Sequence, residues 1–304
     1  MDAPVLETPL IESPLTQPAL TQPVSIETRG IELQTADGHR WQLLARIPAA
    51  PRAALLWLPA LGVSARHYTA FADALAANGI ATFLHEWRGH GSSSLRADHG
   101  CDWAYRELLE HDLPTSQQAV RDALPGLPMI LGGHSLGGQI STCRLTLAPD
   151  SADRLWLVGS GAPFPNTFGP RLKLLLPIAL RLMPWLAKRY GALPGRRIGF
   201  GGREAYGVMR DWAGTGRARR YWIHSLQRDL TALMAEVRAP IDSVVLADDW
   251  YAPASSLHAL VDPLAGSLNM HRLGHAELPS HADHFKWMQT PAVIAKTLAD
   301  TLAA

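Results

Sequence analysis

The spacing of apolar residues changes character about thirty residues into the chain, where an irregular segment gives way to regular elements. Residues 1–25 contain five prolines and follow neither a strand period nor a helix period, so we predict that they form a disordered N-terminal tail. Next, the segments 31–35 and 41–47 flank an Asp37-Gly38 turn, which predicts an antiparallel hairpin.

Beyond the hairpin, short continuous apolar runs alternate with segments of helical period. Such runs are typical of strands that are buried on both faces of a sheet. The predicted strands are residues 53–58, 80–84, 128–132, 154–159, 241–247 and 267–273. The predicted helices are residues 68–78, 115–124, 136–147, 254–264 and 291–302. This alternation predicts an α/β fold with a mostly parallel central sheet flanked by helices.

One long segment interrupts the alternation and is rich in Leu, Arg and Trp. We predict a core formed by residues 26–162 and 236–304, with residues 163–235 inserted as a helical lid or cap. Such an insertion would cover the C-terminal edge of the sheet, where open parallel sheets bind ligands. Its apolar stretch from Leu172 to Trp185 predicts either a lid over an acyl or aryl group or a helix facing the core, and a third interpretation is that residues 172–189 dock on a membrane or partner.

Composition excludes several classes of protein. The 304 residues include 28 Lys or Arg and 27 Asp or Glu, and a net charge of +1 argues against nucleic acid or an anionic membrane as the main partner. Two cysteines cannot form a disulfide framework, and the N-terminus lacks the basic and apolar regions of a secretory signal. No stretch approaches the ~18 apolar residues of a membrane span. We therefore predict a cytoplasmic protein without a transmembrane segment.

The strongest chemical signal is the sequence Gly133-His134-Ser135-Leu136-Gly137-Gly138, between a predicted strand and a predicted helix. This is the strand–turn–helix context of a nucleophile elbow, in which a serine occupies a strained turn. Glycines are needed on both sides because a Cβ there would collide with the neighbouring strand or helix. A phosphate-binding loop is excluded, because Gln139 stands where that motif requires lysine.

An oxyanion hole in this arrangement uses the residue after the nucleophile and a residue in the loop after an earlier strand. The loop Pro59-Ala60-Leu61-Gly62 follows the strand at residues 53–58. We therefore predict that the backbone N–H groups of Leu61 and Leu136 are the two donors.

The acid and the base should follow the serine in that order along the chain. Two adjacent carboxylates, Asp248 and Asp249, stand at the end of the last long predicted strand, where an orienting acid would face the crevice. The base should lie in the loop before the terminal helix, which makes His284 the first candidate, His281 the second and His275 the third. No HExxH pattern or cysteine cluster accompanies His281, Asp283 and His284, so we predict neither a metal nor a cofactor.

Several of these motifs together resemble the α/β-hydrolase superfamily, and in particular its bacterial serine aminopeptidase-like branch. The matching motifs are Leu58-Pro59-Ala60-Leu61-Gly62, Ala65-Arg66-His67-Tyr68, Trp87-Arg88-Gly89-His90-Gly91-Ser92-Ser93, Gly133-His134-Ser135-Leu136-Gly137-Gly138, Pro194-Gly195-Arg196-Arg197-Ile198-Gly199-Phe200-Gly201, Met209-Arg210-Asp211-Trp212, Asp248-Asp249, Ala252-Pro253 and His284-Phe285. The resemblance covers about residues 30–300 and implies the α/β-hydrolase fold.

The resemblance also implies roles for individual residues: Ser135 as nucleophile, Asp249 as acid and His284 as base. One position departs from the pattern, because Asp283 stands where the family usually has glycine. A carboxylate there would raise the pKa of the imidazole if it pointed inward.

These features predict a serine hydrolase that cleaves carboxylic esters of small molecules through an acyl-enzyme. Three alternatives stay open at this point. An aminopeptidase-like amidase would need an acidic clamp, for which Glu204 and Asp211 are the candidates; an acyltransferase would use the same triad; and a binding scaffold would usually have lost a triad residue.

Overall fold

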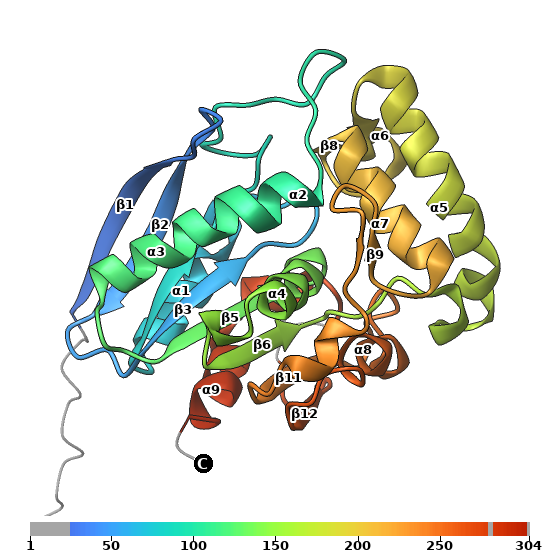
Figure 1. Ribbon diagram of the computed structural model, residues 1–304. Coiled ribbons are helices and arrows are strands. Elements are labelled where there is room, and N and C mark those ends of the chain that lie inside the picture. Colours follow the sequence, from blue (N-terminus) through green and yellow to red (C-terminus); the bar gives the residue numbers. More distant parts are fainter. Residues whose placement is uncertain (1–24, 279–281, 303–304) are drawn as a thin grey trace, which may run out of the picture.

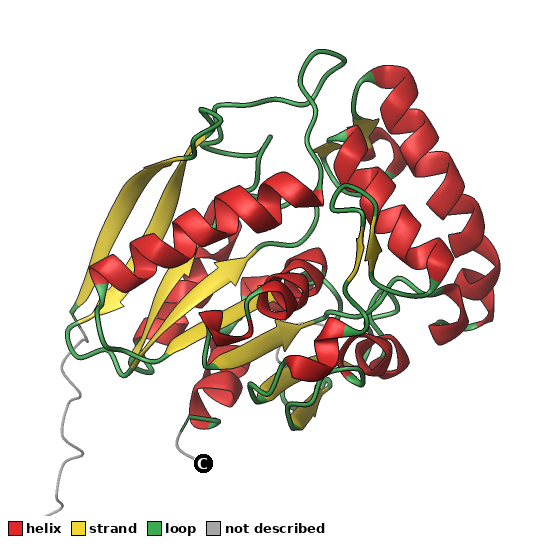
Figure 2. Cartoon of the chain, viewed as in Figure 1, coloured by secondary structure: helices red, strands yellow, loops and turns green. Residues whose placement is uncertain are grey.

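The structure is a computed structural model that describes residues 25–278 and 282–302. Its central element is an eight-stranded sheet in the order β1-β2-β4-β3-β5-β6-β11-β12 (Figures 1 and 2). The strands are β1 (Ile26–Gln34), β2 (Arg40–Pro48), β3 (Ala53–Leu58), β4 (Ile80–Leu84), β5 (Met129–His134), β6 (Arg154–Val158), β11 (Ile241–Leu246) and β12 (Leu268–Leu273). The predicted tail lies outside the described residues apart from Ser25.

The sheet is antiparallel only at one edge. β1 pairs with β2, and β2 with β4, in antiparallel register, which confirms the predicted hairpin. All other neighbours are parallel. The prediction of a mostly parallel sheet is therefore confirmed, and the C-terminal ends of β3, β5, β6 and β11 meet along one edge.

Helices cover both faces of the sheet. They are α1 (Thr69–Ala76), α2 (Tyr105–Glu107), α3 (Leu113–Ala123), α4 (Leu136–Leu147), α8 (Ala254–Val261) and α9 (Ala292–Asp300), and a π-helical turn (Leu108–Asp112) joins α2 to α3. Side chains along β3 point alternately to the two faces of the sheet, and both faces are covered, so the sequence of this strand is apolar throughout. Leu56 and Leu58 belong to the hydrophobic cluster that includes residues of α3, α4 and α8, whereas Leu55 and Trp57 belong to the cluster that includes residues of α1 and α9.

Residues 163–235, which we call the cap segment, lie between β6 and β11 in the chain and beyond the C-terminal ends of the strands (Figure 1). The segment contains the helices α5 (Pro170–Tyr190), α6 (Gly195–Ile198) and α7 (Tyr206–Ala218). The pattern predicted helices only, but the segment also holds two short antiparallel ribbons. They are formed by β7 (Leu193–Pro194) with β8 (Arg203–Glu204) and by β9 (Trp222–Ile223) with β10 (Arg228–Asp229). Strands of two residues are too short to show a period in the sequence.

Candidate active site

A chain of hydrogen bonds joins the three residues that the sequence singled out. The Oγ of Ser135 lies 2.9 Å from Nε2 of His284, and Nδ1 of the same imidazole lies 2.7 Å from Oδ2 of Asp249. The His284 ring and the Asp249 carboxylate are almost fully buried, whereas Ser135 keeps partial exposure. These residues come from segments 149 and 35 positions apart, so only the tertiary fold brings them together.

Ser135 occupies the sharp turn between β5 and α4. Its φ of 54° and ψ of −117° lie in a region that side chains other than glycine rarely adopt, at a cost of about 1–3 kcal/mol. Hydrogen bonds from neighbouring segments hold this backbone in place. The Ser135 N–H donates to the carbonyl of Val158 on β6, and the Ser160 hydroxyl donates to the carbonyl of Ser135. The predicted strain is therefore present and is fixed on two sides.

The glycines beside Ser135 are required by contact with other backbone. A Cβ on Gly133 would lie 2.3 Å from the carbonyl carbon of Gly137, and a Cβ on Gly137 would lie 2.1 Å from the carbonyl oxygen of Leu58. A side chain at Gly133 would therefore push the start of α4 away from β5, and one at Gly137 would push it away from the end of β3. This close approach brings the start of α4 against the end of β3, and so near the loop that contains Leu61.

The structure distinguishes the two adjacent aspartates. The second oxygen of the Asp249 carboxylate, Oδ1, accepts hydrogen bonds from the backbone N–H groups of Tyr251 and Ala252, while Oδ2 faces His284. Asp248 is instead half exposed and pairs with Nε2 of His275 at 2.9 Å. Asp249, the aspartate that the resemblance implied, is the one oriented toward the imidazole.

The other candidate histidines do not reach Ser135 in the described residues. His275 pairs with Asp248, and His281 lies outside the residues that the structure describes. Asp283 does not turn its carboxylate toward the His284 ring. It accepts hydrogen bonds from the backbone N–H groups of Phe285 and Lys286 and pairs with the Lys286 ammonium at 3.3 Å. The Asp283 carboxylate is thus held by its own loop and does not point inward.

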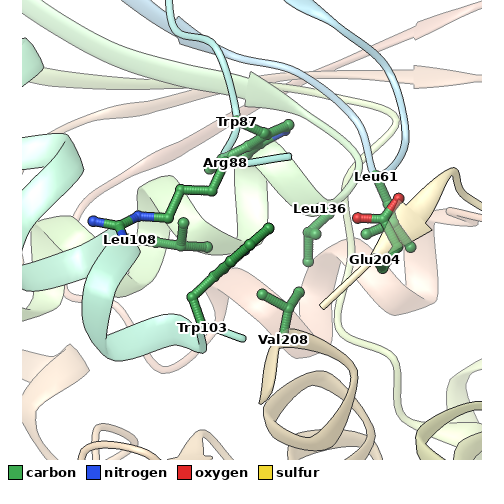
Figure 3. A pocket seen from close by; sticks show the side chains of 8 residues that line it. All are labelled: Leu61, Trp87, Arg88, Trp103, Leu108, Leu136, Glu204 and Val208. Atoms are coloured by element: carbon green, nitrogen blue, oxygen red, sulfur yellow. The ribbon is translucent and has the colours of Figure 1, made fainter. Parts of the chain in front are cut away.

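Leu61 and Leu136 both line one small cavity beside the elbow. α4 begins at Leu136, so the N–H of this residue belongs to the first helical turn, whose N–H groups have no partner within the helix. The lining is mostly apolar and comes from both the core and the cap segment: Leu61, Trp87, Arg88, Trp103, Leu108, Leu136, Glu204 and Val208. In Figure 3 the guanidinium of Arg88 points away from the centre of this group.

A buried link that the sequence analysis missed connects the elbow with the loop of Leu61. The Tyr68 hydroxyl accepts a hydrogen bond from the Ala60 N–H and lies 2.8 Å from Nδ1 of His134. Burial, and then the nearby charge of His284, hold the pKa of His134 well below its ordinary value, so this imidazole stays neutral at neutral pH. Tyr68 thus fixes the backbone immediately before Leu61 relative to the elbow. In the sequence analysis Tyr68 appeared only as part of the motif Ala65-Arg66-His67-Tyr68, and no role was assigned to it.

Gly159 is a second residue that the pattern did not reveal. It follows β6 with a φ of 51°, and a Cβ there would lie 3.0 Å from Oδ2 of Asp249. A side chain at this position would therefore crowd the carboxylate that faces His284. The sequence signal was a single glycine at the end of a strand, which is common at turns and carries no chemistry.

The cap segment touches the loop of Leu61 directly. A Cβ on Gly62, whose φ is 78°, would lie 2.3 Å from the backbone nitrogen of Gly202. Nearby, the Glu204 carboxylate accepts a hydrogen bond from the Gly202 N–H and lies 3.3 Å from Nε2 of His90. Burial lowers the pKa of His90, but the hydrogen bond and charge of Glu204 outweigh it, and the pKa is raised above its ordinary value.

Asp211, the second carboxylate considered as a substrate clamp, is buried, and its oxygens already accept hydrogen bonds within the protein. It accepts hydrogen bonds from the backbone N–H groups of Tyr105 and Ser225, and also from the Ser225 hydroxyl. Burial raises its pKa above the ordinary value. Asp211 therefore joins the cap segment to α2, while Glu204 is the only one of these two carboxylates that lines the cavity.

In residues 25–278 and 282–302, no cluster of three or more His, Cys, Asp or Glu side chains is arranged to hold a metal ion. Among the same residues, no helix has the length and apolar character that crossing a bilayer requires.

The sheet order, the elbow after β5 and the serine, histidine and aspartate at one edge define the α/β-hydrolase class. The family model for serine aminopeptidases (S33) matches residues 49–197. The chain has the α/β-hydrolase fold, and over residues 49–197, just under half of its length, it is similar to this family. The match includes Leu61 and Ser135 but ends before Asp249 and His284, so the geometry alone brings the acid and the base to the site.

Solved structures agree on the fold. A hydrolase from Pseudomonas aeruginosa PA01 is 22% identical, with a TM-score of 0.59 over 90% of this chain and 98% of that chain. A highly thermostable carboxyl esterase from Bacillus coagulans is 16% identical, with a TM-score of 0.65 over 92% of this chain and 99% of that one. A thermophilic esterase from Thermogutta terrifontis is 15% identical, with a TM-score of 0.60 over 90% and 98%. At these identities the likeness extends to the fold.

Proposed function

We propose that the protein is a serine hydrolase that cleaves carboxylic esters with an apolar acyl group. The observation that carries this proposal is the unbroken hydrogen-bond chain from the Ser135 hydroxyl through His284 to Asp249. A serine is a weak nucleophile unless a base removes its proton, and an imidazole within hydrogen-bond distance does so. The apolar lining beside Ser135 favours an acyl chain over a charged group.

The geometry supports the following sequence of steps. Nε2 of His284 accepts the proton of the Ser135 hydroxyl while Oγ attacks the ester carbonyl, and the imidazolium then protonates the leaving alcohol. Asp249 holds the Nδ1–H tautomer and stabilises the imidazolium charge. The N–H groups of Leu61 and Leu136 bind the oxyanion, a contribution worth about 10²–10³ in rate. Water attacks the acyl-enzyme with His284 again as base, which restores Ser135.

A second candidate, an aminopeptidase-like amidase, is favoured by one observation. Glu204 lines the cavity beside Leu61, where a carboxylate would bind a substrate amine. The pairing of Glu204 with His90 weakens this candidate, because the carboxylate already has a cationic partner when His90 is protonated. Esters are therefore the first choice, and an acyltransferase with the same triad differs only in the group that accepts the acyl chain.

The test is a panel of short-chain and long-chain p-nitrophenyl esters beside aminoacyl-p-nitroanilides, assayed with wild type and Ser135→Ala. We expect ester turnover in the wild type, a loss of about 10⁴–10⁶-fold in Ser135→Ala, and fluorophosphonate labelling at Ser135 alone. His284→Ala should lose activity by orders of magnitude, whereas His281→Ala and His275→Ala should retain it.

Three outcomes would change the assignment. Faster turnover of anilides than of esters would favour the amidase, and acyl transfer to an added alcohol in preference to water would favour the acyltransferase. Turnover and labelling that persist in Ser135→Ala would overturn the proposal.

A further inference from the structure

α5 carries a row of large apolar side chains on its outer surface. Leu174, Ile178, Leu182 and Trp185 follow one another at spacings of four, four and three residues, which places them on one helix face. They are 72%, 58%, 47% and 59% exposed, and Leu175 beside them is 56% exposed. We call these five residues the α5 stripe. A contiguous apolar patch of this kind on a globular protein marks an interaction surface.

The opposite face of α5 is already fully used. Leu180, Pro184 and Ala187 are buried, and the side chain of Leu180 packs at Gly216 on α7, where a Cβ would lie 2.8 Å from it. α5 is the outermost helix of the cap segment in Figure 1, with α7 on its inner side. The stripe is therefore additional to the apolar face that holds the cap segment together. A helix that is apolar on both faces normally has hydrophobic surroundings on both.

The charges on α5 indicate what those surroundings are. The helix contains five lysines or arginines and no aspartate or glutamate. All five are exposed, and none forms an ion pair with a described residue: Arg171, Lys173, Arg181, Lys188 and Arg189. They stand at both ends and in the middle of a helix that is about 30 Å long. Uncompensated cations around an apolar stripe are the pattern of a helix that lies in an anionic lipid interface.

The cap segment as a whole strengthens this charge argument. Of the 28 basic and 27 acidic side chains of the chain, 13 basic and only 3 acidic ones lie in residues 163–235. The net charge of +1 is therefore the sum of a strongly cationic cap segment and an acidic remainder of the chain. The net charge argued against an anionic membrane as the main partner, but a total says nothing of how the charges are distributed along the chain.

We propose that the α5 stripe and its cations dock the enzyme on an anionic phospholipid surface, with α5 lying in the plane of the interface. Nucleic acid is disfavoured as the partner because phosphate binding leaves exposed leucines and a tryptophan without a role. A second copy of this chain is disfavoured because the cations of two facing α5 helices would repel each other across the contact. Docking does not depend on the ester reaction, so it is measured without turnover.

The experiment is flotation of the full-length protein with vesicles of phosphatidylcholine alone and of phosphatidylcholine with phosphatidylserine. We expect at least about tenfold stronger binding to the anionic vesicles, weakened by added salt. Ser135→Ala should bind like the wild type. The double variant Ile178→Ser with Leu182→Ser should lose at least about tenfold in binding, because two large side chains no longer enter the bilayer. Lys188→Gln with Arg189→Gln should lose a similar factor on anionic vesicles only.

Matched controls come from the edge strand β12, which carries an exposed methionine and an exposed arginine. Met270→Ser and Arg272→Gln should leave binding unchanged. The stripe variant, the Lys188 and Arg189 variant and the two β12 variants should keep the melting temperature and the turnover of a water-soluble ester, because the altered residues are exposed and lie outside the catalytic centre.

Equal binding to neutral vesicles, or unchanged binding by the stripe variant, would overturn the proposal. So would sedimentation equilibrium that shows a dimer which the stripe variant dissociates, since a second copy would then cover the stripe.

Discussion

The core and the cap segment differ in how their polar and apolar side chains are used. In the core, Ser135, His284 and Asp249 are fixed by buried hydrogen bonds between distant segments and by glycines that permit close backbone contact. In the cap segment, the outer helix exposes large apolar side chains, together with cations that form no ion pair with any residue the structure describes. The difference teaches that the core holds its polar side chains in fixed positions, while the cap segment leaves apolar and cationic side chains available for contact with other surroundings.

The largest effect that would test this division belongs to the core. Asp249→Asn should lower kcat for a p-nitrophenyl ester by about 10⁴-fold, because asparagine favours the wrong imidazole tautomer and cannot stabilise the imidazolium. Steady-state kinetics measure this change.

The neighbouring residue supplies the matched control. Asp248→Asn removes a carboxylate that is half exposed and paired with His275, so activity should stay within about a factor of two of wild type. If the two variants lost activity equally, the acid would not be Asp249 alone and the core would not fix the imidazole as described.

A smaller effect is expected where the two regions meet. Gly62→Ala places a methyl group 2.3 Å from the backbone of Gly202, so the loop of Leu61 or the cap segment must shift. A displacement of about 1 Å near the reacting atoms costs about 100-fold in rate, and we expect kcat to fall by that factor.

Gly38→Ala is the control for backbone strain, because Gly38 has a similar φ of 86° but open space around its Cβ position. It should destabilise folding by about 1 kcal/mol and leave kcat unchanged. Equal kcat values for the two variants, measured on folded protein, would mean that the contact between core and cap segment does not position Leu61.

The smallest effect concerns the free energy of unfolding at acidic pH, whose pH dependence we expect to come from a histidine in the core. Burial lowers the pKa of His85, just after β4, to about 4, with Asp112 opposing the shift and His39 and Arg88 adding to it. The unfolded chain therefore binds a proton below pH 6.5 that the folded chain does not bind until about pH 4. Because of this difference in proton binding by His85, the free energy of unfolding should fall by about 2 kcal/mol from pH 7 to pH 5.

Urea unfolding of the wild type and of His85→Gln at both pH values measures the effect. Glutamine retains a polar group near Ser116 but does not titrate, so the variant should lose correspondingly less stability on acidification. The single histidine of the cap segment, His224, is exposed, and His224→Gln should leave the pH dependence unchanged. If His224→Gln removed the dependence instead, the acid-sensitive group would lie in the cap segment.

What the sequence predicted well depends on local pattern. The elbow was readable because its glycines and serine lie within six residues, and the strands were readable because burial on both faces gives unbroken apolar runs. Asp249 and His284 needed the resemblance as well, since position alone left Asp248, His281 and His275 open.

What the sequence did not predict depends on contacts across the fold. The link from Ala60 through Tyr68 to His134, the space that Gly159 leaves for Asp249, and the pairing of Glu204 with His90 each join segments that lie far apart in the chain. A tyrosine or a glycine is compatible with many roles, so no local pattern selects one. For a related reason the apolar stretch of α5 stayed open among three interpretations, because an apolar helix has the same sequence whether it faces a core or solvent.

The contact between Gly62 and Gly202 has a consequence for protein engineering. With no room for a methyl group between these two stretches of backbone, a chimaera that receives the cap segment of another hydrolase must receive a matching loop after β3 as well. Exchange of the cap segment alone would displace the loop that contains Leu61.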